Sequence, residues 1–282
     1  MTTDDGRPPL AGVCGYPIAQ SKSPLLFRHW FTEHGMTGYY VPLLIEPGSF
    51  ETVLPTLFKA GFRGVNVTLP HKETALALAD EVSDAAQAIG AANTITFDPD
   101  GRIQADNTDG FGFFSNVAAG APDWDPSTGP ALLLGAGGAA RAAIHELLRG
   151  GTPEIRLANR TRDRAEALAD HFGDRITVVD WSERCTAADG AVTIANSTSL
   201  GMTGKPPLEI SLDAAPANAV VTDMVYNPLE TDLLAQARAR GLATVDGLGM
   251  LLHQARPGFE RWFGPRPQVN DALRAACLGT DP

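Results

Sequence analysis

Ala131-Leu132-Leu133-Leu134-Gly135-Ala136-Gly137-Gly138-Ala139-Ala140-Arg141 is the stretch that decides the fold of this chain. Four apolar residues lead straight into a glycine cluster, and a helix-favouring segment follows at 142–148. Strand, tight turn and helix in this order are typical of the first βα unit of a dinucleotide-binding domain. Gly135 permits the sharp turn, Gly137 lets the backbone approach a pyrophosphate, and Ala140 lets the helix pack closely on the strand.

We therefore predict that dinucleotide phosphates bind at the N-terminus of this helix, where backbone N–H groups lack partners and the dipole favours negative charge. The residues expected to form this cradle are Gly135, Ala136, Gly137, Gly138 and Ala139. The alternative is an ordinary strand-to-helix turn in an α/β sheet. The flanking strand and helix patterns favour the cofactor.

The composition is that of an ordinary globular protein, with 282 residues, 44% hydrophobic and 20% charged. A formal net charge of −11 argues against nucleic acid or an anionic membrane surface as the main partner. Cys14, Cys185 and Cys277 are scattered without metal-ligand spacing, which indicates a reduced compartment and no bound metal. We find no apolar run of membrane-spanning length and no signal-peptide core, so we expect a cytoplasmic protein.

The order of predicted elements indicates an α/β protein with two domains. Strands expected at 11–16, 39–45 and 64–69 alternate with helices expected at 23–33, 50–60 and 71–81, and a hairpin is expected at 92–97 and 102–105. This alternation predicts a mainly parallel sheet in the first half. We expect a Rossmann-type nucleotide-binding domain at 111–247, inserted into a first domain formed by 1–110 plus 248–282, to which a C-terminal helix returns.

The end of the second strand of the nucleotide domain selects the cofactor. An NAD enzyme usually places an acidic residue there, whereas a basic residue accommodates the 2′-phosphate of NADP. Here Asn159, Arg160 and Thr161 follow the strand, and Arg164 lies one helical turn further on. Arginines at a helix N-terminus oppose the dipole unless an anion is present. The pattern therefore favours NADP(H), against the alternative of a solvated helix start.

Two helix starts in the first half carry candidate site residues. Ser21 and Ser23 precede Pro24, and we expect Ser23 to be the N-cap residue. The two hydroxyls suit a small carboxylate, although helix capping alone would explain them. Lys72 lies at the next helix start, where the dipole disfavours its ammonium form and makes it a candidate acid–base group. A surface lysine paired with Glu73 is an equally good interpretation.

Other polar residues follow strands in the same half. Asn66, Thr68 and Asn93 lie at strand ends, where α/β sheets bind ligands. The segment 106–110 holds two carboxylates in a tight polar turn, a pattern that caps helices more often than it catalyses. Gln254 lies on an otherwise apolar helix face, which allows either a core polar contact or a ligand contact.

Seven motifs occur in one order: Gly-x-Pro-Ile-x-x-Ser-Lys-Ser-Pro (15–24), Asn-Val-Thr-x-Pro-x-Lys (66–72), Ala-Asn-Thr (92–94), Asp-Asn-Thr-Asp-Gly (106–110), Gly-Ala-Gly-Gly-Ala-x-Arg (135–141), Asn-Arg-Thr (159–161) and Asp-Gly-Leu-Gly-Met-Leu-x-x-Gln (246–254). Together they closely resemble the shikimate dehydrogenase family, over about residues 11–275. The resemblance implies a reversible, NADPH-dependent reduction of 3-dehydroshikimate to shikimate in aromatic amino-acid biosynthesis.

The resemblance also implies roles for individual residues. The substrate-binding set would be Ser21 and Ser23 for the carboxylate, Thr68, Asn93 and Gln254 for the ring hydroxyls, Asn66 lining the pocket, and Tyr226 facing the substrate from the nucleotide side. Lys72 and Asp109 would be the catalytic pair and would also contact substrate. The cofactor set would be the glycine cradle, Asn159, Arg160, Thr161 and Arg164, with Thr198 under the nicotinamide ribose and Met224 and Gly247 beside the nicotinamide.

Two other functions are open to this sequence. An NAD-dependent quinate/shikimate dehydrogenase would fit the fold, but Arg160 and Arg164 argue against it. A non-catalytic nucleotide sensor would be expected to lack Lys72 or Asp109, and both are present. The expected partner is a small-molecule substrate, and the chain is expected to be a monomer or a homodimer.

Overall fold

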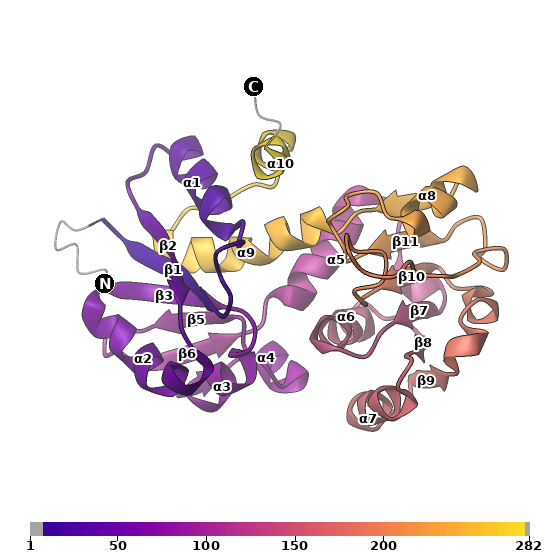
Figure 1. The fold of residues 1–282 in the computed structure, drawn as a ribbon, viewed down its shortest axis with the longest axis horizontal. Coiled ribbons are helices and arrows are strands. Elements are labelled where there is room, and N and C mark those ends of the chain that lie inside the picture. The colour runs from indigo at the N-terminus through magenta and orange to yellow at the C-terminus, as the bar shows by residue number, and fades with distance from the viewer. Residues whose placement is uncertain (1–7, 280–282) are drawn as a thin grey trace. The chain divides into compact units, whose positions relative to one another are not determined.

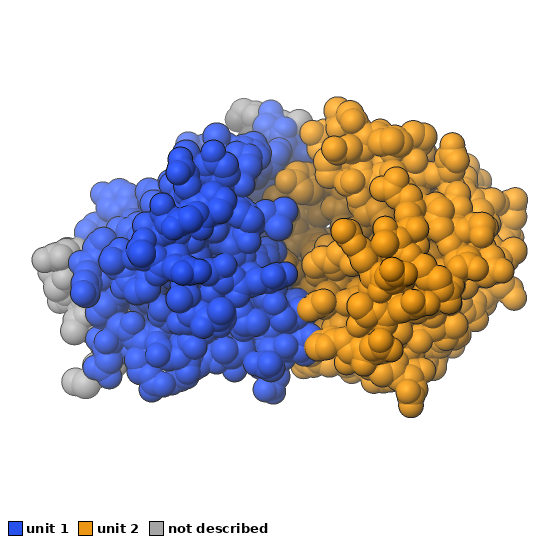
Figure 2. Space-filling model, turned by 60° about the horizontal axis from the view of Figure 1, so that its bottom comes forward, with its two compact units in different colours: residues 1–108, 254–282 blue, residues 109–253 orange. Residues whose placement is uncertain are grey.

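The computed structural model of the chain describes residues 8–279 (Figure 1). It divides into two compact units, which Figure 2 colours separately. Unit 1 contains the residues up to Thr108 and those from Gln254 onward, and unit 2 contains Asp109–His253. The assignment of 111–247 as a nucleotide-binding domain stays a prediction. None of the helices within 8–279 is long and apolar enough to cross a membrane.

Unit 1 is built on a mixed sheet. Its strands are β1 (Leu10–Gly15), β2 (Tyr39–Leu44), β3 (Phe62–Val67), β4 (Glu81–Val82), β5 (Thr94–Phe97) and β6 (Ile103–Asp106). In the described part of the chain they lie in the order β2-β1-β3-β5-β6-β4. Strand β1 pairs in parallel with β2 and β3, whereas β5 runs antiparallel to β3 and β6. The hairpin expected from the sequence is thus formed by β5 and β6.

Helices cover both faces of this sheet (Figure 1). They are α1 (Ser23–Glu33), α2 (Phe50–Leu57), α3 (Lys72–Ala77), α4 (Asp84–Ile89), α9 (Leu248–Phe263), which begins in unit 2, and α10 (Asp271–Leu278). Phe50 and Leu54 of α2 pack into a core with sheet residues such as Val65. On α1, the ring of Phe27 stacks on Tyr40, with 3.6 Å between ring centroids and 13° between planes. Phe27 also packs beside Trp262 of α9, so an aromatic cluster fills this second layer.

Unit 2 is a doubly wound parallel sheet. Its strands are β7 (Ala131–Leu134), β8 (Ile155–Ala158), β9 (Ile176–Val179), β10 (Thr193–Asn196), β11 (Val220–Asp223) and β12 (Ala243–Val245). Within the described residues their order is β12-β11-β10-β7-β8-β9, and every pairing is parallel. This is the order of a Rossmann-type sheet, whose direction of winding reverses between β7 and β10. The expected fold class is therefore correct.

The helices of unit 2 explain why β7 is apolar throughout. They are α5 (Asp109–Gly120), α6 (Gly138–Arg149), α7 (Arg162–Phe172) and α8 (Asp232–Ala239). Leu132 and Leu134 belong to a core that includes residues of α8, whereas Leu133 belongs to a core with residues of α5, α6 and α7. Successive side chains of a strand point to opposite faces, so a strand covered on both faces reads as a continuous apolar run.

Short 3₁₀ helices join these elements at η1 (Pro47–Ser49), η2 (Phe58–Ala60), η3 (Pro126–Thr128), η4 (Trp181–Glu183) and η5 (Thr186–Ala188). Two expected boundaries are wrong. The helix expected at 71–81 ends at Ala77, because Glu81–Val82 pairs with β6 as strand β4. The segment 106–110, expected to be a polar turn, is already helical from Asp109.

Gly64 of β3 gives a test of the packing in unit 1. A Cβ atom there would lie 2.1 Å from Trp262 Nε1 and 2.2 Å from the carbonyl oxygen of Ile95. We expect Gly64→Ala to lower the free energy of unfolding by about 1–3 kcal/mol, the usual cost of overpacking a filled core. Urea denaturation followed by tryptophan fluorescence measures this change. Gly48→Ala is the control, because a Cβ at Gly48 meets no atom within 4 Å, and equal effects of the two substitutions would contradict the packing.

Candidate functional site

One edge of the unit 1 sheet gathers polar residues that lie far apart in the sequence. The carboxyl ends of the parallel strands β1 and β3 lie together, and the Thr68 N–H donates to the carbonyl oxygen of Cys14 at 2.9 Å. Because β5 runs antiparallel to β3, it begins at this same edge, where the Val67 N–H donates to the carbonyl oxygen of Asn93 at 2.8 Å. Strand β6 runs back to the edge, so Thr108 also arrives there.

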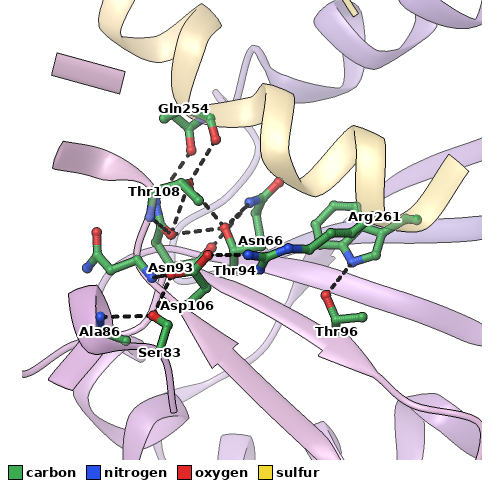
Figure 3. A network of polar contacts seen from close by, with 12 residues as sticks. Asn66, Ser83, Ala86, Asn93, Thr94, Thr96, Asp106, Thr108, Gln254 and Arg261 are labelled. Atoms are coloured by element: carbon green, nitrogen blue, oxygen red, sulfur yellow. Dashed lines mark hydrogen bonds and ion pairs between the residues drawn. The ribbon is translucent and has the colours of Figure 1, made fainter. Parts of the chain in front are cut away.

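The side chain of Asn93 is held by several donors (Figure 3). Its Oδ1 accepts from the Thr108 N–H at 2.8 Å and from the Thr94 hydroxyl at 2.9 Å. A backbone N–H can only donate, so Oδ1 and Nδ2 of this amide cannot be exchanged. Nδ2 lies 3.5 Å from Gln254 Oε1, and the Thr108 hydroxyl donates to the carbonyl oxygen of Gln254 at 2.8 Å. Asn93 and Gln254, both predicted site residues, are thus brought together.

Both polar atoms of the Asn66 side chain are hydrogen-bonded within the protein. Its Nδ2 donates to the Asn93 carbonyl oxygen at 3.2 Å and to Thr94 Oγ1 at 3.1 Å. Its Oδ1 accepts from the Tyr40 hydroxyl at 2.7 Å. Tyr40 and Thr94 also belong to this cluster, and neither was a predicted site residue. The alternation of β2 was the available signal for Tyr40, because a tyrosine on the buried face of a strand needs a partner for its hydroxyl.

Lys72 and Thr68 lie at the same edge. Lys72 is the first residue of α3, is half-buried, and its carbonyl oxygen accepts from the Ala92 N–H at 2.9 Å. The carbonyl oxygen of Thr68 accepts from the His71 N–H at 3.0 Å, which closes the turn into α3. The His71 ring is buried, lies flat against Phe50, and bonds through Nε2 to the Ile45 carbonyl oxygen. His71 therefore fixes the turn that presents Lys72.

The serine pair is placed differently from the prediction. The expectation that Ser23 caps α1 is wrong, because Lys22 is the N-cap residue and makes no side-chain capping bond. Ser23 is the first helical residue, and its N–H donates to Ser21 Oγ at 3.3 Å. Its side chain is buried. The Lys22 ammonium group donates to the carbonyl oxygen of Cys277 at 2.7 Å, which ties the serine segment to α10.

Burial controls the ionisation of Tyr40. Desolvation raises the pKa of its phenol well above the ordinary value, the Cys14 thiol adds to this effect, and the bond from Ser23 opposes it. The phenol therefore keeps its proton and acts as a donor to Asn66.

The turn before Asp109 is fixed by Asp106. Its Oδ1 accepts from the Ser83 hydroxyl at 2.5 Å and from the Asn107 N–H at 2.8 Å. Its Oδ2 forms an ion pair with Arg261 of α9 at 2.6 Å (Figure 3). Asp106 is thus a structural carboxylate, whereas Asp109 is the first residue of α5.

In unit 2, the turn after β7 presents bare backbone. Gly135 has a φ of 108°, which side-chain-bearing residues rarely adopt, and a Cβ there would lie 2.7 Å from Ser197 Oγ and 2.9 Å from Thr198 Cγ2. Cβ atoms at Gly137 or Gly138 would meet nothing within 4 Å. Ala136 and Ala139 are half-buried beside them. The first N–H groups of α6 therefore face a space that phosphate groups can fill, which fits a dinucleotide.

Three arginines lie at the start of α7, and they differ in their partners. Arg162 pairs with Glu166 at 2.8 Å and with Asp180 at 2.5 Å. Within residues 8–279, neither Arg160 nor Arg164 has a carboxylate at ion-pair distance, and both are exposed. Arg160 and Arg164 lie near the N-terminus of α7, and neither is neutralised by an ion pair within the described residues. Two such guanidinium groups fit the 2′-phosphate of NADP(H).

The turn that carries Arg160 is also fixed. Asn159 Nδ2 donates to the carbonyl oxygen of Thr161 at 2.8 Å. Thr161 is the N-cap residue of α7 and makes no side-chain capping bond. The predicted residues Asn159, Arg160 and Thr161 thus follow β8, the strand next to β7.

The remaining predicted cofactor residues follow β10, β11 and β12. Thr198 lies beside Gly135, and its hydroxyl donates to Asn196 Oδ1 at 2.7 Å. A Cβ at Gly247 would lie 2.6 Å from the carbonyl carbon of Met224, so these two residues are in contact. Tyr226 lies two residues beyond Met224 and is exposed.

A buried carboxylate, Asp223, ends β11 just before Met224. It accepts from Asn196 Nδ2 at 2.9 Å, from the Val225 N–H at 2.9 Å and from the Thr231 hydroxyl at 2.7 Å. Burial raises the pKa of Asp223 above its ordinary value, although the three hydrogen bonds act in the opposite direction. Asp223 therefore fixes the backbone on both sides of Met224.

Comparison with known proteins gives consistent findings. Residues 13–95 match the family model of the shikimate dehydrogenase substrate binding domain, and residues 124–224 match that of shikimate / quinate 5-dehydrogenase. The shikimate dehydrogenase (NADP(+)) of Roseobacter denitrificans is 59% identical over 271 residues, which covers 96% of this chain and 98% of that protein. The protein of the same name from Dinoroseobacter shibae is 60% identical over 270 residues, covering 96% and 97%.

Solved structures agree with these relatives. Shikimate 5-dehydrogenase from Thermus thermophilus, in complex with NADP(H) and shikimate, has a TM-score of 0.84 and 36% identity, covering 96% of this chain and 99% of that one. Quinate dehydrogenase from Corynebacterium glutamicum, in complex with NAD, has a TM-score of 0.88 and 30% identity, with the same coverage of 96% and 99%.

Asp223 gives a prediction on pH. Its folded pKa is raised, so above the ordinary value of 3.8 the unfolded chain loses this proton first. In that window the folded state holds more protons, and the contribution of Asp223 to the free energy of unfolding falls as pH rises. Urea titrations from about pH 4 to about pH 8 should show that Asp223→Asn is least damaging, relative to the unsubstituted protein, at the high end. The exposed Asp123→Asn is the control, and a pH-independent difference for Asp223→Asn would contradict the assignment.

Proposed function

This chain belongs to the shikimate dehydrogenase family, and from that membership we propose that it interconverts 3-dehydroshikimate and shikimate with NADP(H). The single observation that carries this proposal beyond family membership is the fixed polar cluster of unit 1. Asn93 and Gln254 lie together there, with the backbone of Lys72 hydrogen-bonded to the residue before Asn93. A hydroxylated ring needs such preoriented donors and acceptors, which desolvate it without leaving its hydroxyls unpaired.

We propose that the substrate carboxylate binds at Ser21 and Ser23, where hydroxyls accompany the start of α1. The ring hydroxyls bind at Thr68, Asn93 and Gln254, and Asn66 lines the site from below. Tyr226 is a further substrate residue in this proposal. These assignments are supported by the match of the family's substrate-domain model to residues 13–95 and by the contacts that hold Asn93.

The cofactor residues are proposed on the geometry of unit 2. The backbone of Gly135, Ala136, Gly137, Gly138 and Ala139 takes the pyrophosphate, because nothing occupies the space above Gly137 and Gly138. Asn159, Arg160, Thr161 and Arg164 take the adenosine 2′-phosphate. Thr198, Met224 and Gly247 take the nicotinamide end. NADP(H) is the cofactor in the names of the relatives above 50% identity.

Reduction of a ketone needs a hydride on carbon and a proton on oxygen, and bound NADPH supplies only the hydride. We propose that the Lys72 ammonium group supplies the proton and stabilises negative charge on the substrate oxygen. The Asp109 carboxylate would orient the Lys72 ammonium group. In the reverse direction the same pair accepts the proton from the hydroxyl of shikimate.

We propose that the protein works in the cytoplasm, as a monomer or a homodimer, and acts on a small-molecule substrate. The fold is also close to a quinate dehydrogenase crystallised with NAD. Assays with both acids and both cofactors separate the two activities, and Arg160 and Arg164 support the NADP-dependent one.

Lys72→Ala tests the chemistry. We expect kcat for shikimate oxidation with NADP⁺ to fall by about 10²–10⁴-fold, the usual contribution of a positioned acid–base group. Absorbance of the reduced nicotinamide measures it, and circular dichroism checks the fold. Lys59→Ala, on an exposed site in η2, is the matched control. A Lys72→Ala enzyme with wild-type kcat would overturn the assigned role, and turnover only with quinate and NAD⁺ would overturn the proposed activity.

Arg160→Ala tests the cofactor. Loss of a charge-assisted bond costs about 1.5–3 kcal/mol, so we expect the KM for NADP⁺ to rise by about ten- to a hundredfold. The KM for NAD⁺ should change by less than about twofold. Arg162→Ala is the matched control, because the guanidinium group of Arg162 already pairs with Glu166 and Asp180. Equal effects of both substitutions on the two cofactors would contradict the 2′-phosphate site.

A further inference from the structure

Tyr40 is a buried residue on the edge strand of unit 1, and the proposed chemistry does not use it. The alternation of β2 leaves Tyr39 55% exposed and Tyr40 8% exposed. The Tyr40 ring is stacked on Phe27, and the ring of Trp262 lies 6.4 Å away at 29°. Its ring is therefore held by stacking on Phe27 and by the neighbouring Trp262, and its hydroxyl is held by the bond to Asn66.

The direction of each hydrogen bond around Tyr40 follows from which atoms can only accept. The carbonyl oxygen of Asn93 can only accept, so the Asn66 atom 3.2 Å from it is Nδ2. Asn66 Oδ1 must then be the atom that faces Tyr40, and the phenol donates to it at 2.7 Å. The phenol has one proton, and its bond to Asn66 uses that proton.

The remaining protons extend this order to Asn93. Thr94 Oγ1 accepts from Asn66 Nδ2 at 3.1 Å and donates its own proton to Asn93 Oδ1 at 2.9 Å. The Thr108 hydroxyl lies within reach of two acceptors, and its shorter bond, 2.8 Å, is to the carbonyl oxygen of Gln254. Thr94 is therefore the hydroxyl that donates to Asn93 Oδ1. The bonds therefore run in one direction, from Tyr40 through Asn66 and Thr94 to Asn93.

This series of hydrogen bonds ends at the proposed substrate site, because Asn93 belongs to the group that we assign to the ring hydroxyls. The three residues behind Asn93, which are Tyr40, Asn66 and Thr94, are 8%, 6% and 0% exposed. Asn66 uses both N–H groups within the protein, so it acts on the substrate chiefly through Asn93.

We propose that Tyr40 is a positioning residue for shikimate binding, which acts through Asn66 and Thr94 to fix the orientation of the Asn93 amide. This inference rests on the proposed function, because it takes Asn93 to contact the ring hydroxyls of the substrate. Without the phenol hydroxyl, Asn66 Oδ1 loses its donor. The Asn66 amide would then no longer be held in the orientation that bonds to Thr94 and to the backbone of Asn93.

The test measures shikimate binding directly as well as turnover. We expect Tyr40→Phe to raise the Kd for shikimate, from titration calorimetry, and its KM by about tenfold, the effect of one misplaced hydrogen bond. The KM for NADP⁺ should stay unchanged, since it depends on unit 2. The matched control is Tyr39→Phe, which removes the same hydroxyl from the neighbouring exposed residue and should leave both constants unchanged.

A second pair of variants covers the case in which Tyr40→Phe does not fold. Thr94→Val removes the hydroxyl at nearly constant shape and should weaken shikimate binding as Tyr40→Phe does, whereas Thr94→Ser should restore most of the affinity. A double-mutant cycle then tests the linkage. If Tyr40 acts on Asn93 through Thr94, adding Tyr40→Phe to Thr94→Val should cost less than Tyr40→Phe alone.

The outcomes are distinguishable. Shikimate affinities of Tyr40→Phe and Thr94→Val equal to those of the unsubstituted protein would overturn the positioning role. So would a parallel loss of affinity for NADP⁺, since that would indicate general destabilisation. A protein that binds shikimate but does not oxidise it would contradict the proposed function alone, because the binding constants still test Tyr40. A protein that does not bind shikimate at all would contradict the proposed function on which the inference rests.

Discussion

The structure of unit 1 depends on one constraint, which is that every buried amide must find its hydrogen-bond partners inside the protein. Asn93 Oδ1 accepts from both Thr94 and Thr108, and Asn66 donates to the backbone beside it. An amide with its acceptor occupied in this way has one orientation. The polar edge of the sheet is therefore rigid because of its own bonds, and it is fixed before any substrate arrives. Preorganisation of this kind is what allows a site to recognise a hydroxylated ligand without reordering itself.

The predicted cofactor site of unit 2 is built differently from the polar cluster of unit 1. Its predicted cradle consists of backbone groups left uncovered by side chains at Gly137 and Gly138, and of two arginines without carboxylate partners in the part of the chain that the structure describes. These groups indicate a ligand, because exposed N–H groups and unneutralised guanidinium groups at helix starts favour an anion. Arg162 shows the contrast, since its neighbours Glu166 and Asp180 already neutralise it.

Local patterns predicted the fold better than the boundaries. The strand, turn and helix around Gly135 were predictable because a positive φ and a close approach are properties of a few consecutive residues. The end of α3 was not, because Glu81–Val82 leaves the helix pattern to pair with β6, a strand that comes later in the chain. The N-cap of α1 was misplaced by one residue, because Lys22 and not Ser23 holds that position. The roles of Tyr40 and Thr94 were not predicted, because Asn66, the residue that both of them bond to, lies on another strand.

The same network also explains why the connections of unit 1 lie where they do. Thr108 is the residue at which the chain leaves unit 1, and Gln254 is the residue at which it returns. A hydrogen bond of 2.8 Å joins the Thr108 hydroxyl to the carbonyl oxygen of Gln254, and Asn93 contacts both residues. Residues separated by most of the chain are thus fixed by one amide. Both connections are hydrogen-bonded to Asn93. Insertion of a whole second unit between them therefore leaves the polar edge of the first sheet intact, provided that this amide keeps its partners.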